Sequence, residues 1–273
     1  MPLQRAITDF GADHSFAEVA KKLKEHYRIE VPVSASRTIT QLHAQEMLLR
    51  EESFQPMGVR GVSQLIGEID GTNVPIVEIP KKSENFTKDR RKMRKVCWRE
   101  ARLALARKPE AIRGIYRATM GGVEEAGEQL QNCVVALGGG RKTRLHCVGD
   151  AAAWIINQIE ARFSDRASYL IDFYHLSEYL YGAAEELASK DKQEWVREQQ
   201  SKMKANRVGE VIKELRKEIE KGKGGRQIAM EACERYMANH EEYFDYKGAI
   251  EKGLPIGSGE VEGGHRWVIQ KRL

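Results

Sequence analysis

The chain has 273 residues, of which 41% are hydrophobic and 31% are charged, and a formal net charge of +5, as in a soluble globular protein. No apolar run approaches the ~20 residues that span a bilayer, and residues 1–16 lack the order of a signal peptide, so we expect neither a membrane protein nor a secreted one. We expect a cytoplasmic protein with one domain and a large insertion, or one domain plus a small one. Four cysteines without paired spacing are expected to be reduced core thiols: Cys97, Cys133, Cys147 and Cys233.

Residues 3–52 have a helical pattern throughout. Ser15 followed by Glu18 is a capping box that opens an amphipathic helix, and Ser34 is expected to cap a further helix that ends near Glu51. Two helices joined by a short turn, after a weaker first helix, favour a helix-turn-helix that binds DNA. A trihelical packing module is the alternative. In the DNA-binding interpretation, base edges are contacted by Arg37, Thr38, Thr40 and Gln41.

From residue 62 the pattern changes to β-branched and small residues. Candidate strands are Val62–Asp70, Asn73–Ile79, Val96–Leu105, Ile112–Thr119, Thr143–Val148 and Ser168–Phe173. Helices are expected at Val123–Leu137 and Ala151–Phe163, so the later strands are connected by helices in an α/β sheet. The stretch Leu176–Gly248 is helical, highly charged and without a strand pattern.

Positive charge is concentrated in Lys88–Arg102, which holds eight basic residues against two acidic ones. This imbalance favours a polyanionic partner, whereas a solvated face is the alternative. Within this stretch we expect DNA contacts from Arg90, Arg91, Lys92, Arg94 and Lys95. The stretch Lys202–Lys223 is also basic, but glutamate is interleaved with lysine, so we interpret it as a solvated face.

Three acidic residues lie in unusual settings. An apolar run ends at Asp70 and another at Asp150, each followed at once by glycine or alanine, and a glycine-rich turn leads into a helix that carries Glu262. Open α/β sheets build their sites at the carboxyl ends of strands, and the first and fourth strands are neighbours if the sheet order is 3-2-1-4-5. Carboxylates are the ligands that hard divalent cations prefer, so the three acids predict a site for two Mg²⁺ or Mn²⁺ ions.

Each acid also has a structural alternative. An Asp-Gly pair such as Asp70 and the residue after it is most often a turn. Asp150 could be the N-cap of the helix that follows it. Glu260 lies two residues before Glu262, and two residues turn a helix by about 200°, so only one of the two can face a site.

Other motifs near the same strands are less specific. Asp172 and His175 follow the last strand and either orient a ligand or have a structural role. The stretch Leu137–Thr143 follows a helix and lacks the glycine before lysine, so it is not a phosphate loop. Trp195 is expected to pack in a core, and stacking on a flipped base is its alternative.

The stretches ITDFGADHSF, GEIDGTNVP, CWREARLALA, HCVGDAAAWI, YLIDFYHLSEYL and GLPIGSGEVEGGH resemble, in order and spacing, those of bacterial insertion-sequence DDE transposases of the IS-Kra-like group. LPIGSG-x-V-E is the most specific of these motifs. The resemblance carries the family's two aspartates and glutamate over to Asp70, Asp150 and Glu262. The intervals are 80 residues (150−70) and 112 residues (262−150), and the longer one holds the helical stretch.

This resemblance implies an RNase H-like mixed five-stranded sheet with helices. It also implies a DNA transposase that performs 3′-end hydrolysis and strand transfer with two metal ions, acts on double-stranded DNA at transposon ends and target, and forms homo-oligomers. The expected organisation is a helix-turn-helix in 1–55, the first part of the core in 60–175, a helical insertion in 176–252 and the final catalytic helix in 253–273.

Two features depart from the family. Small residues usually follow the glutamate, whereas here GGHRW follows, so we expect His265 and Arg266 to change how this helix contacts DNA. Family members are longer at both ends, whereas this chain ends 11 residues after Glu262 (273−262). We therefore consider that it is a fragment, the product of a split reading frame or a decayed copy of a transposase. Two alternatives therefore stay open: a truncated, inactive DNA-binding derivative that represses transposition, and an RNase H-like nuclease that cuts without joining.

Overall fold

The computed structural model describes residues 2–51, 58–78, 94–187, 191–221 and 227–270. The chain divides into two compact units. The first unit combines residues 1–56, 72–101 and 263–273, and the second combines 57–71 with 102–262. No helix in the described ranges is long and apolar enough to cross a membrane.

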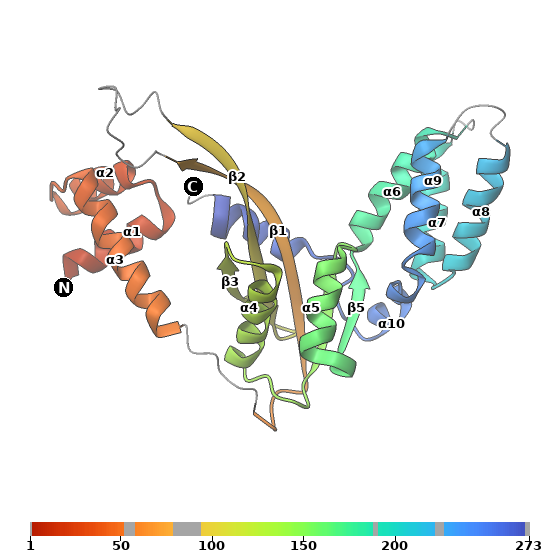
Figure 1. Ribbon diagram of the computed structural model, residues 1–273, viewed down its shortest axis with the longest axis horizontal. Helices are drawn as coiled ribbons and strands as arrows, with labels where there is room; N and C mark the ends of the chain where they lie inside the picture. The colour runs from red at the N-terminus through yellow and green to blue at the C-terminus, as the bar shows by residue number, and fades with distance from the viewer. Residues whose placement is uncertain (1, 52–57, 79–93, 188–190, 222–226, 271–273) are drawn as a thin grey trace, which may run out of the picture. The chain divides into compact units, whose positions relative to one another are not determined.

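Three helices form the N-terminal part of the first unit: α1 (Pro2–Asp13), α2 (Phe16–Tyr27) and α3 (Val33–Glu51) (Figure 1). Their small core is made by Ile7, Val19 and Leu23. The capping box is confirmed, because Ser15 Oγ accepts a hydrogen bond from the Glu18 N–H at 3.4 Å and donates to Glu18 Oε2 at 3.3 Å.

The predicted start of α3 is wrong by two residues. The helix begins at Val33, so Ser34 lies inside its first turn rather than at its N-cap. The carbonyl of Pro32 accepts hydrogen bonds from the N–H groups of Ala35 and Ser36 at 3.0 and 3.1 Å. Proline has a fixed φ that suits the start of a helix, which explains why the helix begins here.

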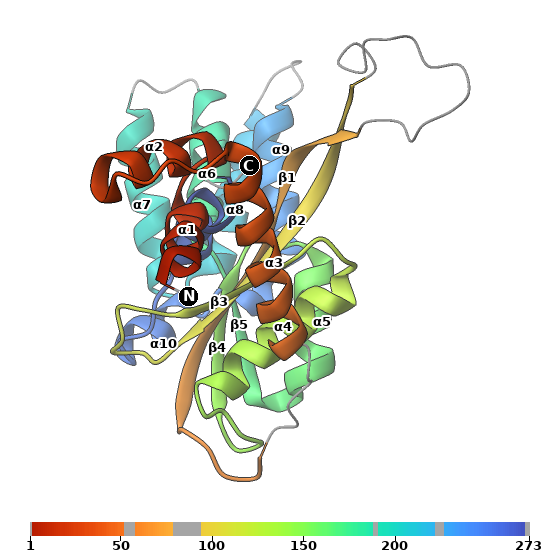
Figure 2. The ribbon, with the colours of Figure 1, turned by 90° about the vertical axis from the view of Figure 1, so that its left-hand side faces the viewer.

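The described strands form a mixed five-stranded sheet in the order β3-β2-β1-β4-β5, which confirms the α/β class and the predicted 3-2-1-4-5 order. β2 and β3 are antiparallel to each other, whereas β4 is parallel to both β1 and β5. Figures 1 and 2 show β1 and β2 side by side. The bounds are β1 Gln64–Glu78, β2 Lys95–Arg107, β3 Ile115–Thr119, β4 Arg144–Gly149 and β5 Ala167–Ile171.

Two predicted strands, at 62–70 and 73–79, are one continuous strand in the structure. The turn expected at Asp70 is therefore absent, and Asp70 lies within β1 rather than at its end. The strand continues because β2 accompanies it past the end of β4. Contacts between the two strands persist there, since the Cys97 thiol donates to the Ile76 carbonyl at 3.5 Å.

One face of the sheet is covered by α4 (Val123–Ala136) and α5 (Ala153–Phe163) (Figure 1). Leu65 and Ile69 of β1 are buried in the cluster that these helices form with the sheet. Side chains alternate between the two faces of a strand, so Glu68 and Asp70 are directed to the opposite face.

The remaining helices follow β5 and confirm the helical pattern expected after residue 176. They are α6 Phe173–Glu185, α7 Lys192–Lys204, α8 Val208–Lys221, α9 Ile228–Ala238, α10 Tyr246–Glu251 and α11 Gly259–Gly264. Their apolar cluster includes Leu170 and Ile171 of β5, so helices α6 to α10 belong to the same compact unit as β4 and β5. All four cysteines are free, as expected, and every one except Cys97 is buried.

Candidate active site

Asp70 and Asp150 lie on neighbouring parallel strands. The β1–β4 register pairs Glu68 with Val148, and two further residues bring Asp70 level with Asp150, directly after β4. Adjacent strands are about 4.8 Å apart, so the two backbones hold these acids as near neighbours. The sheet therefore brings together the two aspartates that were predicted from sequence.

Both aspartates accept a hydrogen bond from the backbone close to them. Asp70 Oδ1 accepts from the Gly71 N–H at 2.7 Å, and Asp150 Oδ1 accepts from the Ala152 N–H at 3.0 Å. The N-cap of α5 is Ala152, so the alternative in which Asp150 caps this helix is wrong. Tyr169 donates its hydroxyl to the Asp150 carbonyl, which fixes the backbone at the same point.

The third acid, Glu262, lies on α11 and is exposed. Partial burial raises the pKa of its carboxyl, and the negative charges of Asp172 and Asp70 raise the pKa further. Glu262 is thus close enough to Asp70 for their charges to interact. Glu260 is engaged elsewhere, because its Oε1 atom lies 2.6 Å from Nε of Arg107 in an ion pair. Glu262, rather than Glu260, is therefore the glutamate of this helix that remains available to act with the aspartates.

The segment that leads into α11 is bound to the sheet by backbone carbonyls. His146 of β4 donates from Nε2 to the Pro255 carbonyl at 2.9 Å, and the Phe173 N–H donates to the Ile256 carbonyl at 2.8 Å. A Cβ on Gly257 would lie 2.7 Å from the ring of Tyr174, so a larger residue at this position would require that side chain to move. These contacts explain how the LPIGSG segment is held against the sheet.

Asp172 also binds the segment that leads into α11, and its side chain is buried, with 2% of the residue exposed. Its Oδ1 atom caps α6 by accepting from the N–H groups of Tyr174 and His175 at 2.6 and 2.9 Å. Its Oδ2 atom accepts from the N–H of Ser258 and from the Ser258 hydroxyl, the latter at 2.7 Å. Both oxygens of this carboxylate thus accept hydrogen bonds from backbone groups or a hydroxyl, which supports the structural alternative for Asp172.

His175 is half-buried beside aromatic side chains. Its ring lies edge-on to Tyr179 at 5.5 Å and to Tyr236 at 6.0 Å, and its Nδ1 atom is 3.6 Å from Glu178 Oε2. A positive charge on His175 would lower the pKa of Glu262. His175 therefore lies near the third acid.

Sequence analysis did not single out Glu68, which is 1% exposed and accepts a hydrogen bond at Oε2 from the Val261 N–H at 2.8 Å. Burial raises its pKa to about 8, and the charge of Glu260 acts in the same direction. A signal existed in the sequence, because a glutamate interrupts an apolar run two residues before Asp70 and so shares its face of the strand.

Carboxylates at one end of a sheet are the donors that hard divalent cations prefer. In the parts of the chain that the structure describes, however, no three His, Cys, Asp or Glu side chains are grouped closely enough to hold a metal ion. The acids fit a divalent cation in chemistry and location, but the structure does not assemble them into one ligand shell.

The predicted DNA-contacting residues are spread over several segments. On α3, Arg37, Thr38 and Gln41 are exposed, whereas the Thr40 hydroxyl donates to the Ile7 carbonyl of α1 at 3.5 Å, so Thr40 was wrongly expected to reach a base. Arg94 and Lys95 are exposed at the start of β2. Three further residues lie outside the described ranges: Arg90, Arg91 and Lys92.

After α11, His265 is buried with 5% of its surface exposed, and Arg266 is exposed with its guanidinium 5.5 Å from the Trp267 ring. Trp195 packs against the apolar cluster of the helical segment, as the core interpretation predicted.

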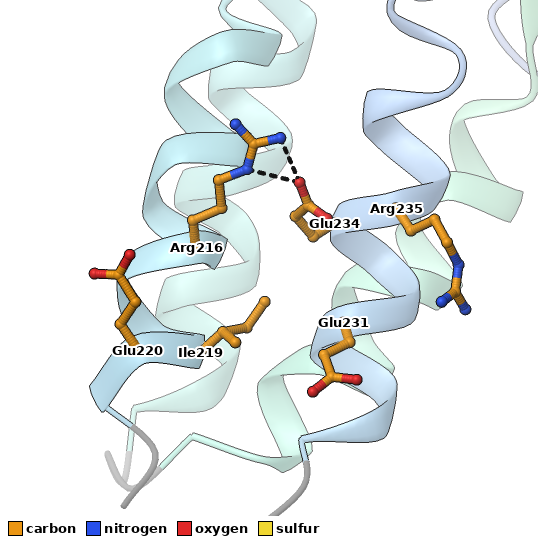
Figure 3. A pocket seen from close by; sticks show the side chains of 6 residues that line it. All are labelled: Arg216, Ile219, Glu220, Glu231, Glu234 and Arg235. Carbon is orange, nitrogen blue, oxygen red and sulfur yellow. Dashed lines mark hydrogen bonds and ion pairs between the residues drawn. The ribbon is translucent and has the colours of Figure 1, made fainter.

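A hollow of about 480 Å³ lies between α8 and α9 (Figure 3). Arg216 Nη2 and Glu234 Oε1 form an ion pair across it at 2.6 Å. Its other lining residues are Ile219, Glu220, Glu231 and Arg235. All of them come from these two helices, so the hollow is separate from the three acids.

Comparison of the chain with protein-family models finds no match, and comparison with curated proteins finds none either.

Proposed function

We propose that this protein is a DDE-type DNA transposase that cuts the ends of an insertion sequence and joins them to target DNA. One observation carries the proposal: Asp70 and Asp150 lie level with each other on neighbouring parallel strands of a sheet of order 3-2-1-4-5, and the charge of Asp70 acts on Glu262. A helical segment separates β5 from the third acid, in agreement with the order implied by the transposase resemblance.

In this proposal Asp70, Asp150 and Glu262 would hold two Mg²⁺ or Mn²⁺ ions. Bound ions would activate water or a 3′-hydroxyl and stabilise the leaving oxygen of an in-line displacement. The sheet sets the separation of the two aspartates, whereas α11 sets the distance of Glu262 from them. Ala151 and Ala152 follow Asp150 with small side chains, which would allow the DNA backbone to approach closely.

The exposed side chains of α3 and the start of β2 are the candidates for binding DNA. They comprise Arg37, Thr38, Gln41, Arg94 and Lys95. Basic side chains would neutralise phosphates, whereas Gln41 and Thr38 could reach base edges.

The test compares Asp70→Asn and Asp150→Asn with the wild-type chain, using labelled DNA ends from the sequence flanking the gene and a target plasmid. Both substitutions keep the side-chain shape but remove the negative charge. We expect strand transfer to fall by roughly 10²–10³-fold or more, as with the loss of other preorganised charged groups, while binding of the labelled ends is retained. Asp165→Asn is the matched control, because Asp165 is exposed and far from the three acids in the chain.

Each alternative has its own outcome. Cleaved but unjoined DNA would indicate a nuclease, and binding of element ends with no cleavage in Mg²⁺ or Mn²⁺ would indicate an inactive derivative. Normal strand transfer by Asp70→Asn or Asp150→Asn would overturn the assignment of these residues.

A further inference from the structure

The helix that carries the third acid is too short to be stable by itself. α11 spans six residues and continues directly as a π-helix over His265–Ile269, and an isolated helical stretch of this combined length is at best marginal in water because nucleation is costly. Its place on the sheet therefore depends on side chains that bind its first turn. Two strands provide them: β1 through Glu68 and β2 through Arg107.

The contact from β1 reaches the residue next to the third acid. Glu68 Oε2 accepts a hydrogen bond from the N–H of Val261, which directly precedes Glu262. Glu68 also lies two residues from Asp70 on the same face of β1, a separation of roughly 7 Å along a strand. The same short stretch of β1 thus carries one acid of the candidate site and binds the helix that carries another.

Glu68 is an unfavourable residue for a core. It is 1% exposed, and among the described residues its Oε1 atom has no hydrogen-bond partner. A buried carboxyl of this kind is less favourable than an apolar side chain of similar volume. Its presence is explained if the oxygen that accepts from Val261 has a role that an apolar side chain could not provide.

We propose that Glu68 is a positioning residue, which holds α11 so that Glu262 lies at the correct distance from Asp70 and Asp150 to share divalent cations with them. This inference rests on the proposed function, because it assumes that the three acids bind the ions. Arg107 assists by pairing with Glu260 on the same turn, which keeps that glutamate away from the aspartates.

The test is Mn²⁺ binding to the full chain, measured from the electron paramagnetic resonance signal of free Mn²⁺. Glu68→Gln keeps an oxygen that can accept from the Val261 N–H, whereas Glu68→Leu has similar volume and no acceptor. We expect Glu68→Gln to bind Mn²⁺ almost as the wild type does. Glu68→Leu should bind about 10- to 100-fold more weakly, as is typical when a group that orients a metal ligand is lost.

A control separates positioning from general stability. Gln199 is fully buried in the helical segment and donates to Glu214 Oε2 at 2.9 Å, so Gln199→Leu also replaces a buried polar group. We expect Gln199→Leu to lower the Tm without changing Mn²⁺ affinity. In strand-transfer assays, high Mg²⁺ should restore Glu68→Leu but not Asp70→Asn, because only the first retains all three ligands.

Several outcomes would overturn the inference. Wild-type Mn²⁺ affinity in Glu68→Leu, or equal weakening in Glu68→Gln and Glu68→Leu, would contradict a positioning role for the acceptor oxygen. If Glu68→Leu does not fold, Glu68→Met provides the same comparison, because its flexible side chain fits irregular cores. Absence of Mn²⁺ binding by the wild type, or unchanged binding by Asp70→Asn, would instead overturn the proposed two-metal function itself.

Discussion

The carboxylate of Asp172 accepts hydrogen bonds from both of the segments between which it lies. Tyr174 and His175 belong to the first turn of α6, and Ser258 belongs to the turn before α11. A buried carboxylate is tolerated when several donors surround it, which is the case here. This residue connects the end of β5 to the helix that carries Glu262.

Replacement of Asp172 by alanine should lower the free energy of unfolding by about 2–4 kcal/mol, because it removes a helix cap and leaves buried donors unsatisfied. Asp172→Asn should cost less, since asparagine is an equally good N-cap. Urea denaturation measures both values. Asp165→Ala, at an exposed site, is the control and should change stability by no more than about 0.5 kcal/mol. Equal losses in the Asp165 and Asp172 alanine variants would contradict this account.

At the scale of elements, the turn before α11 is placed by β4 as well as by Asp172. His146 lies in β4 and is 4% exposed. Since the Pro255 carbonyl can only accept, Nε2 carries the proton, and Nδ1 lies 3.3 Å from the Ser168 hydroxyl. A neutral imidazole therefore binds the turn to the sheet.

The wild-type protein should lose stability as the pH falls below about 6.5, the ordinary pKa of histidine. Burial lowers the pKa of His146, with a smaller effect from Lys252, while the Pro255 carbonyl and Asp245 oppose the shift. The unfolded chain thus binds a proton at a higher pH than the folded chain, and the contribution is present above pH 6.5 and lost on acidification.

The pH dependence of the wild type is compared with that of His146→Gln, whose side chain can donate to the Pro255 carbonyl but does not titrate. Urea denaturation at about pH 7.5 and about pH 5.5 should show a smaller pH dependence in the variant than in the wild type. Identical pH dependence in the two proteins would show that His146 does not contribute.

At the scale of the whole molecule, the two compact units have different features. The second unit contains most of the sheet, helices α4 to α10 and all three acids. The first contains α1, α2 and α3, with exposed Arg37 and Gln41, whose side chains are linked by a hydrogen bond of 3.3 Å. In our proposal, the first unit therefore binds DNA and the second unit carries the acids that perform the reaction.

Arg37→Ala should weaken binding of double-stranded DNA and reduce the slope of log K against log salt concentration by about 1, because one phosphate contact is lost. Fluorescence anisotropy over a salt series measures this. Lys217→Ala removes one exposed positive charge from the helical segment, which we interpret as a solvated face, and should leave the slope unchanged. If Lys217→Ala lowered the slope and Arg37→Ala left it unchanged, we would assign the DNA-binding surface to the helical segment instead.

Local patterns in the sequence were sufficient for much of the fold. The apolar runs that became β4 and β5, and the amphipathic helices α4 and α5, were predicted within a few residues of their bounds. The Ser15 cap was also predicted. These features depend on residues within one or two turns of each other, where periodicity and capping operate. The choice of Glu262 over Glu260 required the motif resemblance, because the helical period alone only shows that the two diverge.

The tertiary structure decided what depends on distant partners. β1 continues through Asp70 because β2 accompanies it, and the local Asp-Gly pair gives no sign of this. Glu68 has a role in binding α11 through an N–H that lies 193 residues away in the chain. The sequence by itself thus predicted most of the elements and selected the three candidate acids. Only strand pairing and long-range hydrogen bonds decided how the helix of Glu262 is bound to the sheet, because such partners are set by topology rather than by neighbours in sequence.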